Sequence, residues 1–407
     1  ATTEIYTLSL HDALPISAFQ ISVIYANNIS NYLHEIFTVG LPRPADMIFL
    51  YFAGFFIFML LIGTSPWVAF LGAIAFAFST YHFIIIGAGH NTKALAIAYM
   101  APVFGSIIYT LRGNYLSGGI LFSIFLALQL YSNHFQITYY LLFIVILYGL
   151  FEFYRQVREG KTINFLKASG VLVFAALIAV GVNISKIWST YEYAEHTMRG
   201  GTELTSDLRI DRSGLDPAYI TQWSYGIEET LSFLVPNVKG GGSDALLLDE
   251  LIAAQRGTAT EQREAQAILE QHDPAFINFI IEGLQTGNPV NTYWGNQPFT
   301  SGPIYLGAIV MFLFVLSLFY VKGPIKWGFV IAIILSVLLS WGYNFQWFTD
   351  IFIKYIPGYS QFRAVTMILV IAEFCVPALA FIGLHQWYKN PALIKFKSTA
   401  FYTAVVS

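Results

Sequence analysis

The stretch AVTMILVIAEFCVPALAFIGLHQ, residues 364–386, decides the fold class of this chain. A helix needs about 20 mostly apolar residues to cross some 30 Å of hydrocarbon, and this run is long enough. Every backbone N–H and C=O inside a membrane must be satisfied within the segment, so a helix is the structure that fits. The stretch therefore predicts a transmembrane helix with one carboxyl group, Glu373, near its centre.

Eight further apolar runs share this character and do not alternate with the period of two that a membrane β-barrel requires. They lie at residues 46–63, 66–85, 94–111, 115–131, 136–154, 166–185, 303–321 and 326–342. A tenth run begins near residue 398. We therefore predict an all-α polytopic membrane protein with about nine to ten transmembrane helices.

Composition supports this prediction and excludes several functions. The chain is 56% hydrophobic and 11% charged, whereas soluble domains are about 25% charged. A net charge of −3 argues against a basic nucleic-acid binder. The single cysteine, Cys375, excludes intrachain disulfides and cysteine-based zinc sites. No nucleotide-binding, zinc-hydrolase or serine-hydrolase motif occurs in its proper context. No cofactor or metal site is evident, although a divalent metal remains open.

Residues 1–16, ATTEIYTLSLHDALPI, match the translation of a common short-read sequencing adapter. We interpret them as an artefact and exclude them from the fold prediction. We then expect the natural protein to continue upstream of Ser17 and beyond the C-terminal apolar run.

The chain divides into three parts after the adapter-like segment. Residues 17–186 form the first part of a transmembrane bundle, and residues 303–407 form its C-terminal part. Residues 187–302 form a polar loop domain with 16 Asp and Glu against 6 Lys and Arg. Within it, residues 243–255 and 259–271 have helical character, and 236–242 is rich in turn residues. The segment 345–363 is too interrupted to span and suits an interfacial or re-entrant helix.

The distribution of Lys and Arg in short loops predicts the orientation. One set of alternate loops holds nine such residues, and the opposite set holds four: Arg43, Lys93, Lys354 and Arg363. The nine-residue side is predicted to be cytoplasmic. The large loop is then extracytoplasmic, in a bacterial cytoplasmic (inner) membrane, and an odd number of spans is expected upstream.

Four short polar clusters fall on the predicted outer face. They are GAGHNTK (87–93), YSNHFQ (131–136), YWGNQPFTSGP (293–303) and PGYSQFR (357–363). One interpretation is anchoring at the interface by snorkelling and helix-capping side chains. The other is a binding site for a lipid phosphate, because Arg and Lys suit phosphate and charges at this depth are costly without a partner. The candidate residues for that site are His90, Asn91, Lys93, Asn133, His134 and Arg363.

Polar residues elsewhere carry alternatives too. Glu373 could form an interhelical hydrogen bond or line a polar cavity, and an intramembrane carboxyl is a functional candidate by default. In the large loop, Glu229 could act as a base or bind a sugar hydroxyl. Possible sugar or acceptor contacts come from Trp223, Tyr225, Trp294 and Asn296. The alternative there is a solvated surface with ordinary core aromatics. His82 and Lys186, near span ends, are interpreted as snorkelling or capping groups.

Several of these stretches, in order along residues 17–407, resemble the YfhO family of bacterial membrane proteins in its Bacteroidetes-type form. They include GAGHNTKALAIAYMAP, SNHFQITYY, QWSYGIEETLSFLVPN, YWGNQPFTSGPIYLGA and KYIPGYSQFRAVTM. The resemblance implies a GT-C-like helical bundle, a polyprenyl-phosphate sugar donor and a cell-envelope polymer as acceptor. It also implies an essential Asp or Glu in the first outer loop, which we expect to lie upstream of residue 17. Neither Glu35 nor Asp46 is assigned that role.

Three functions remain open at this point. The first is a fragment of a glycosyltransferase that moves a sugar from a polyprenyl phosphate to an envelope acceptor. The second is a transporter or flippase of lipid-linked envelope precursors, and the third is a non-catalytic envelope assembly protein. The first predicts that His90, Lys93, His134 and Arg363 lie together.

Overall fold

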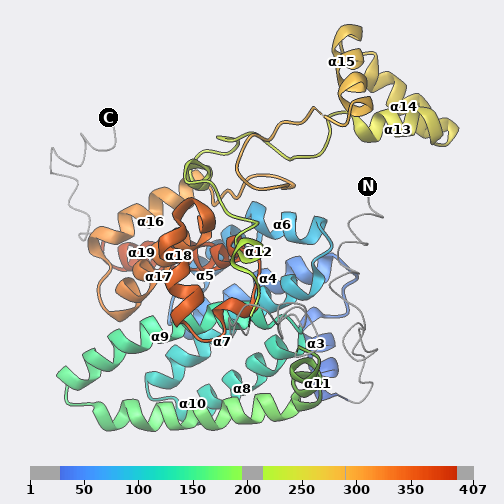
Figure 1. Cartoon of the computed structure of the whole chain (residues 1–407). Helices are drawn as coiled ribbons and strands as arrows, with labels where there is room; N and C mark the ends of the chain where they lie inside the picture. Colours follow the sequence, from blue (N-terminus) through green and yellow to red (C-terminus); the bar gives the residue numbers. More distant parts are fainter. Residues whose placement is uncertain (1–27, 195–213, 289, 392–407) are drawn as a thin grey trace.

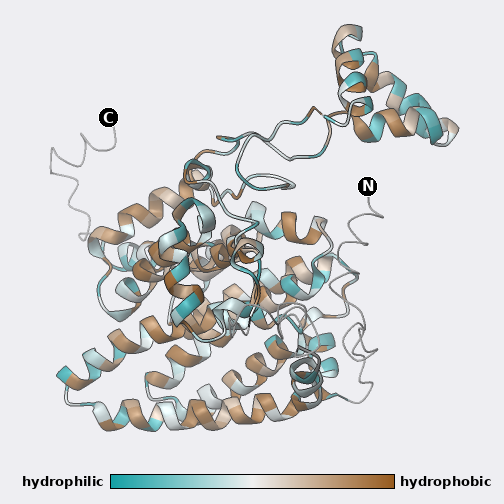
Figure 2. Cartoon of the chain, in the orientation of Figure 1, coloured by the Kyte–Doolittle hydropathy of each residue, from teal (hydrophilic) through white to brown (hydrophobic). Residues whose placement is uncertain are grey.

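The computed structural model describes residues 28–194, 214–288 and 290–391 (Figure 1). Its described residues form helices and turns with no β-strand, and a single isolated bridge joins Gly240 to Tyr293. The adapter-like residues 1–16 and the expected tenth run lie outside the described ranges. Figure 2 shows that the bundle helices are predominantly hydrophobic, as the composition requires.

The bundle helices match the predicted apolar runs in position, except α3 and α18, which lie outside those runs. They are α3 (Ile29–Thr38), α4 (Ala45–Leu61), α5 (Pro66–Ala77), α6 (Thr80–Gly87), α7 (Asn91–Leu111), α8 (Tyr115–Tyr131), α9 (Phe135–Arg158), α10 (Thr162–Val182), α16 (Ala308–Tyr320), α17 (Pro324–Ser340), α18 (Gln346–Tyr355) and α19 (Val370–Lys389). Between them, short 3-10 turns cover Gly342–Phe345 (η3), Tyr359–Gln361 (η4) and Val365–Leu369 (η5). The described part of the chain is therefore all-α.

Helices α7 and α19 form the centre of the bundle. Almost every side chain of α7 from Lys93 onward, and of α19 up to Ile382, is buried. Helix α4 approaches α7 closely at Gly54, where an added Cβ would lie 2.4 Å from the carbonyl oxygen of Ala98. A helix that is apolar on all sides and buried on all sides belongs to the interior of a large bundle or a membrane protein. Helix α10 is peripheral, and most of its apolar side chains face outward.

The predicted count of nine to ten spans is wrong, because several of the helices are too short to cross a membrane. Among the residues that the structure describes, four helices are long and apolar enough to cross a membrane, or up to six if each of two bent pairs counts as one span. Helices α4 and α8 have 17 residues and α16 has 13. At 1.5 Å per residue these reach roughly 20–25 Å, short of the hydrocarbon thickness of about 30 Å. The apolar run at 303–321 predicted a longer helix than the structure has. Residues 303–307 are not helical, and α16 begins only at Ala308.

Two helix pairs are bent at short breaks. Helices α5 and α6 meet at 46°, and α17 turns by 109° into η3 and α18. The second turn requires glycine at Gly342, which has φ 47° and where a Cβ would lie 1.9 Å from Oγ of Ser224. The sharp turn agrees with the prediction that 345–363 does not continue a span.

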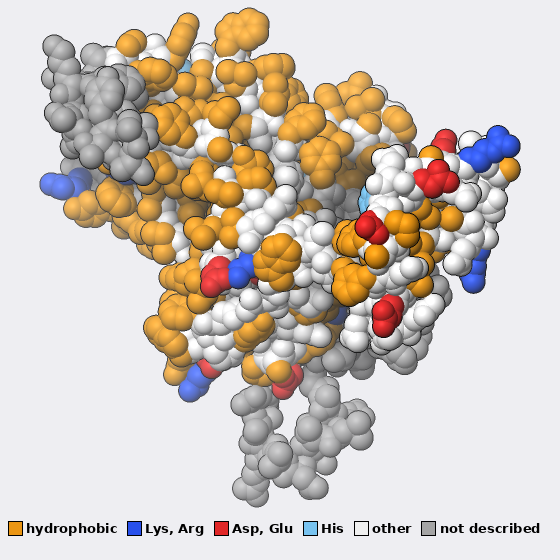
Figure 3. Space-filling view, turned by 90° about the horizontal axis from the view of Figure 1, so that it is seen from above, with side chains coloured by type: hydrophobic (Ala, Val, Ile, Leu, Met, Phe, Trp, Pro, Cys, Tyr) orange, Lys and Arg blue, Asp and Glu red, His pale blue; other side chains and the backbone are white. Residues whose placement is uncertain are grey.

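The described residues of the predicted loop domain 187–302 form short helices and extended connections. Its helix α11 (Ile184–Ala194) begins before the predicted boundary, and its short elements α12 (Pro217–Ile220) and η2 (Glu228–Phe233) lie against the bundle. The remaining helices, α13 (Leu248–Arg256), α14 (Ala259–Leu269) and α15 (Pro274–Gln285), project away on two extended connections (Figure 1). Helices α13 and α14 confirm the predicted helical character, although α13 begins at Leu248. Viewed from above, hydrophobic side chains cover much of the bundle and charged side chains gather over the projecting helices (Figure 3).

Candidate functional site

Four basic or imidazole side chains lie together at the end of the bundle that carries the polar loop domain 187–302, which we call the insert. We call them the mouth cluster: His90, Lys93, His134 and Arg363. His90 precedes α7 and Lys93 lies in its first turn, while His134 directly precedes α9. Arg363 follows the η4 turn. Three of the four predicted polar loops therefore supply this cluster.

The proximity of these groups is visible in their electrostatic effects on one another. Lys93 and Arg363 both act on His90, and Lys93 and His90 both act on His134. A hydrogen bond from Nε2 of Gln136 to the carbonyl oxygen of Arg363, 2.9 Å long, joins the second and fourth polar loops directly. The four side chains are thus near one another in the described residues.

Lys93 is the most unusual member of the mouth cluster. Its side chain is 7% exposed, and its Nζ lies 5.1 Å from the centre of the Tyr81 ring. No carboxylate pairs with it among the described residues, and no hydrogen bond from its Nζ occurs there. Burying an ammonium without an anionic partner is costly, and a cation–π contact offsets only part of that cost. Such a group is poised to bind an anion.

The two imidazoles are neutral at pH 7. Burial, followed by the charge of Lys93, lowers the pKa of His134 to about 3. Burial, followed by Lys93 and Arg363, lowers the pKa of His90 from its usual 6.5. The net positive charge of the cluster therefore comes from Lys93 and Arg363, and the imidazoles offer neutral donors and acceptors. Nδ1 of His134 and Oδ1 of Asn133 are buried without a hydrogen-bond partner in the part of the chain described.

The insert holds Arg363 in place. Its guanidinium donates a hydrogen bond from Nη1 to the Tyr219 hydroxyl and lies 5.5 Å from the centre of that ring. The backbone N–H of Ala364 donates to the Ile220 carbonyl at 3.1 Å, which fixes α12 beside the arginine. Tyr219 and Tyr81 were missed by sequence reasoning because isolated tyrosines in an aromatic-rich chain carry no distinguishing signal.

Asn91 and Asn133 occupy the backbone turns of the site. Asn91 is the first residue of α7, between His90 and Lys93. Asn133 adopts φ 58°, a left-handed conformation that asparagine tolerates better than most residues. Both shape the loops that present the charged groups.

Glu229 is the central acceptor of a hydrogen-bond network outside the mouth cluster. The side chain is 3% exposed and accepts from the backbone N–H of Gly226 at 2.5 Å and the Tyr293 hydroxyl at 2.5 Å. Weaker contacts at 3.5 Å come from the Asn296 N–H and the Gln297 side chain. Burial, then Glu229, raises the pKa of Tyr293, so that phenol stays a donor. With its oxygens occupied, Glu229 ties residues 293–297 to the η2 region.

The predicted sugar contacts divide between core and surface. Tyr225 is buried and stacks on Phe233, and its hydroxyl donates to the Glu229 carbonyl at 2.9 Å, so it offers no free ring face. Trp223 is partly buried against Phe299, with ring centres 5.1 Å apart. Trp294 is 65% exposed. Asn296 is exposed and donates to Oδ1 of Asn344 at 3.1 Å.

Glu373 lies behind the mouth cluster in the core of the bundle. It is 1% exposed, and its Oε2 accepts a 2.5 Å hydrogen bond from the hydroxyl of Ser79. Ser79 directly precedes α6 at the bend after α5, and Glu373 is close enough to act electrostatically on Tyr81. The interhelical hydrogen bond that the sequence allowed is present. Oε1 has no hydrogen-bond partner within the described residues.

His82 and Lys186 had been predicted as snorkelling or capping groups. Lys186 confirms this, since its Nζ donates to the Tyr131 carbonyl at the end of α8, 2.6 Å away. The prediction is wrong for His82, which is fully buried and stacks on Tyr51 with ring centres 3.9 Å apart. A further pair that the sequence did not suggest joins Nδ1 of His34 to the Tyr99 hydroxyl at 2.7 Å.

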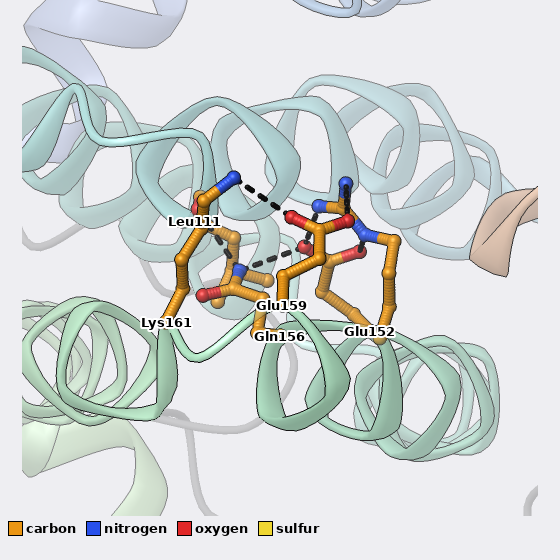
Figure 4. A network of polar contacts seen from close by, with 6 residues as sticks. Leu111, Glu152, Gln156, Glu159 and Lys161 are labelled. Carbon is orange, nitrogen blue, oxygen red and sulfur yellow. Dashed lines mark hydrogen bonds and ion pairs between the residues drawn. The ribbon is translucent and has the colours of Figure 1, made fainter.

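A second polar network lies at the opposite end of α9, away from His134 (Figure 4). We call it the far-end network: Glu152, Arg155, Gln156, Glu159 and Lys161. Arg155 binds Glu152 through two nitrogens, at 2.5 and 3.1 Å, and Gln156 donates to the same carboxylate at 2.7 Å. Lys161 and Arg155 both contact Glu159. Every charge in this network has an opposite charge beside it.

No group of three or more His, Cys, Asp or Glu side chains that could hold a metal occurs in residues 28–194, 214–288 and 290–391. Comparison with known proteins returned no matching family model, no matching curated protein and no matching solved structure.

Proposed function

We propose that this chain is part of a bacterial inner-membrane glycosyltransferase of GT-C-like architecture, with the insert on the extracytoplasmic face. It would take a sugar from a polyprenyl-phosphate donor and transfer it to a cell-envelope polymer. The observation that carries the proposal is the mouth cluster. Lys93 is buried there, no carboxylate of the described chain pairs with it, and both Lys93 and Arg363 act electrostatically on His90.

Each member of the cluster has a distinct role in this proposal. Lys93 and Arg363 neutralise the phosphate, Arg363 with a planar fork and Lys93 as a point charge. The neutral imidazoles of His90 and His134 donate or accept hydrogen bonds without adding charge at pH 7. The exposed Trp294 ring is the available stacking surface for a sugar of the acceptor. No residue of the described chain is assigned the role of the base that activates the acceptor hydroxyl.

The chain in detergent micelles provides a direct test with a short-chain polyprenyl phosphate as probe and the uncharged polyprenol as comparison. Lys93→Met should weaken phosphate binding at least tenfold and leave polyprenol binding unchanged, since only the charge is removed. Lys354→Met is the matched control, because Lys354 is an exposed lysine of α18 whose Nζ lies over the Tyr355 ring at 5.1 Å, outside the cluster. Equal phosphate affinity in wild type and Lys93→Met would overturn the proposal.

A flippase or transporter of lipid-linked precursors is the second candidate. It is favoured by the 46° break between α5 and α6, beside which Ser79 binds the buried Glu373. Broken helices with a polar group at the break are typical of transporter sites. Reconstituted vesicles separate the two functions. Movement of a fluorescent lipid phosphate across the bilayer, without sugar transfer in the intact protein, would favour the second.

A further inference from the structure

A lateral groove runs between helices α8 and α10, away from the mouth cluster. Its volume is about 750 Å³, within the range of roughly 300–1,000 Å³ that small-molecule sites occupy. Apolar side chains and glycines make up most of its lining, including Gly119, Ile120, Gly170, Phe174 and Ile178. The two helices meet closely here, since a Cβ at Gly119 would lie 2.7 Å from a methyl carbon of Val171.

The groove opens on the outside of the bundle. Leu116, Phe174 and Ile178, which all line it, are largely exposed. Helix α10 is one of the four helices long and apolar enough to span, and its outward side chains are apolar. In a membrane this face meets lipid, so the natural occupant of the groove enters from the bilayer.

One end of the groove carries a single cation. Lys167 lines the groove near the start of α10, is exposed, and forms no ion pair with any described residue. Tyr115, at the start of α8, lies at the same end. From Lys167 to Ile178 a helix rises roughly 16 Å at 1.5 Å per residue, about half of the 30 Å hydrocarbon core. The groove therefore has the depth of one leaflet, with its positive charge at the headgroup end.

We infer that this groove binds an anionic glycerophospholipid from the leaflet on the Lys167 side. The acyl chain lies along Gly119, Gly170 and Phe174, and the phosphate meets the ammonium of Lys167. Basic groups beside clefts between transmembrane helices bind anionic headgroups by this combination of charge and apolar area. The inference is independent of the mouth cluster and of glycosyl transfer.

Two substitutions test the two halves of the site. Lys167→Met removes the charge and keeps the length of the side chain. Gly170→Leu fills the groove without a clash, because nothing lies within 4 Å of a Cβ built there. Gly181→Leu is the matched control, since Gly181 is also on α10, also has open space around a Cβ, and lies outside the groove.

The chain is incorporated into nanodiscs of phosphatidylcholine with and without phosphatidylglycerol, and bound lipid is counted by native mass spectrometry. Wild type and Gly181→Leu should retain phosphatidylglycerol at least tenfold more than phosphatidylcholine. Lys167→Met should lose that preference, and Gly170→Leu should lose bound lipid of both kinds. Equal retention by wild type and Gly170→Leu, or no preference in wild type, would overturn the inference. A wild-type dimer that Gly170→Leu separates would assign the groove to a second copy instead.

Discussion

The mouth cluster and the far-end network each contain one Lys and one Arg at opposite ends of the bundle, yet their charges are arranged in opposite ways. In the far-end network, the buried Glu152 accepts from Arg155 and Gln156, and each charge faces its opposite (Figure 4). In the mouth cluster, Lys93 and Arg363 add charge of one sign, and Lys93 has no acidic partner among the described residues. A buried charge with an opposite charge beside it costs less free energy than one without, so Lys93 should destabilise the fold until an anion binds.

The largest expected effect on stability comes from breaking the far-end network. Glu152→Ala removes the acceptor of a buried amide and of Arg155, and should cost about 1–3 kcal/mol of unfolding free energy. Thermal or denaturant unfolding in detergent measures this loss. Glu159→Gln, on the exposed arm of the same network, should leave the midpoint unchanged. An unchanged free energy of unfolding in Glu152→Ala would show that the charge pairing there contributes no stability.

The hydrogen-bond network around Glu229 is a second example of a buried charge with partners, this time in the insert. Glu229→Gln places an amide NH₂ against donors such as the Gly226 N–H or the Tyr293 hydroxyl, and should destabilise residues 293–297 by about 1–2 kcal/mol. Faster hydrogen exchange of the Gly226 and Gln297 amides would report it. The neighbouring Glu228, exposed and paired with Lys239, provides the control Glu228→Gln. Unchanged exchange in Glu229→Gln would contradict the anchoring role.

The imidazoles of the mouth cluster should make stability depend on pH. His134 has a folded pKa of about 3 against 6.5 when unfolded, so the unfolded chain binds more protons below pH 6.5. Stability is therefore complete above about pH 6.5 and falls as the pH drops toward 3, by at most about 1.4 kcal/mol per pH unit for this group. His134→Gln should show a shallower fall of the thermal midpoint between pH 7.5 and 5. An unchanged slope would exclude His134 as its source.

The smallest expected change in stability is that of Lys93→Met, which shows whether Lys93 binds an anion or stabilises the fold. Lys93→Met should leave the thermal midpoint of the empty protein unchanged or raise it, because a buried charge without a partner is replaced by an apolar side chain of similar length. Added inorganic phosphate should stabilise wild type more than this variant. A large drop in the midpoint of the empty protein would instead make Lys93 a structural residue.

Much of the fold could be predicted from the sequence, and the errors have a common cause. Each apolar run corresponds to a helix or helix pair, because hydropathy and helix formation are local properties. The run 303–321 predicted too long a helix because Pro303 and Gly307 keep apolar residues out of α16. The run 66–85 predicted one helix, but a break between Ala77 and Thr80 divides it into α5 and α6. A hydropathy scale counts such apolar residues as part of a span even where the backbone is not helical.

The site was predicted in part. His90, Lys93, His134 and Arg363 converge because short loops at one end of antiparallel helices must meet there. Tyr219 and Tyr81, which contact the two cations, carry no such signal in the sequence. The sequence also could not predict that the Glu229 carboxylate accepts hydrogen bonds within the chain, since its partner Tyr293 is 64 residues away.

The sequence by itself determined that this protein is helical and apolar enough to enter a membrane, where its helices lie, and which loops are polar. Only the tertiary structure decided which of those polar groups are paired. Glu152 and Glu229 are surrounded by donors, whereas Lys93 is buried against an aromatic ring. Hydropathy acts residue by residue along the chain, but a hydrogen bond or an unpaired charge depends on which distant segments pack together.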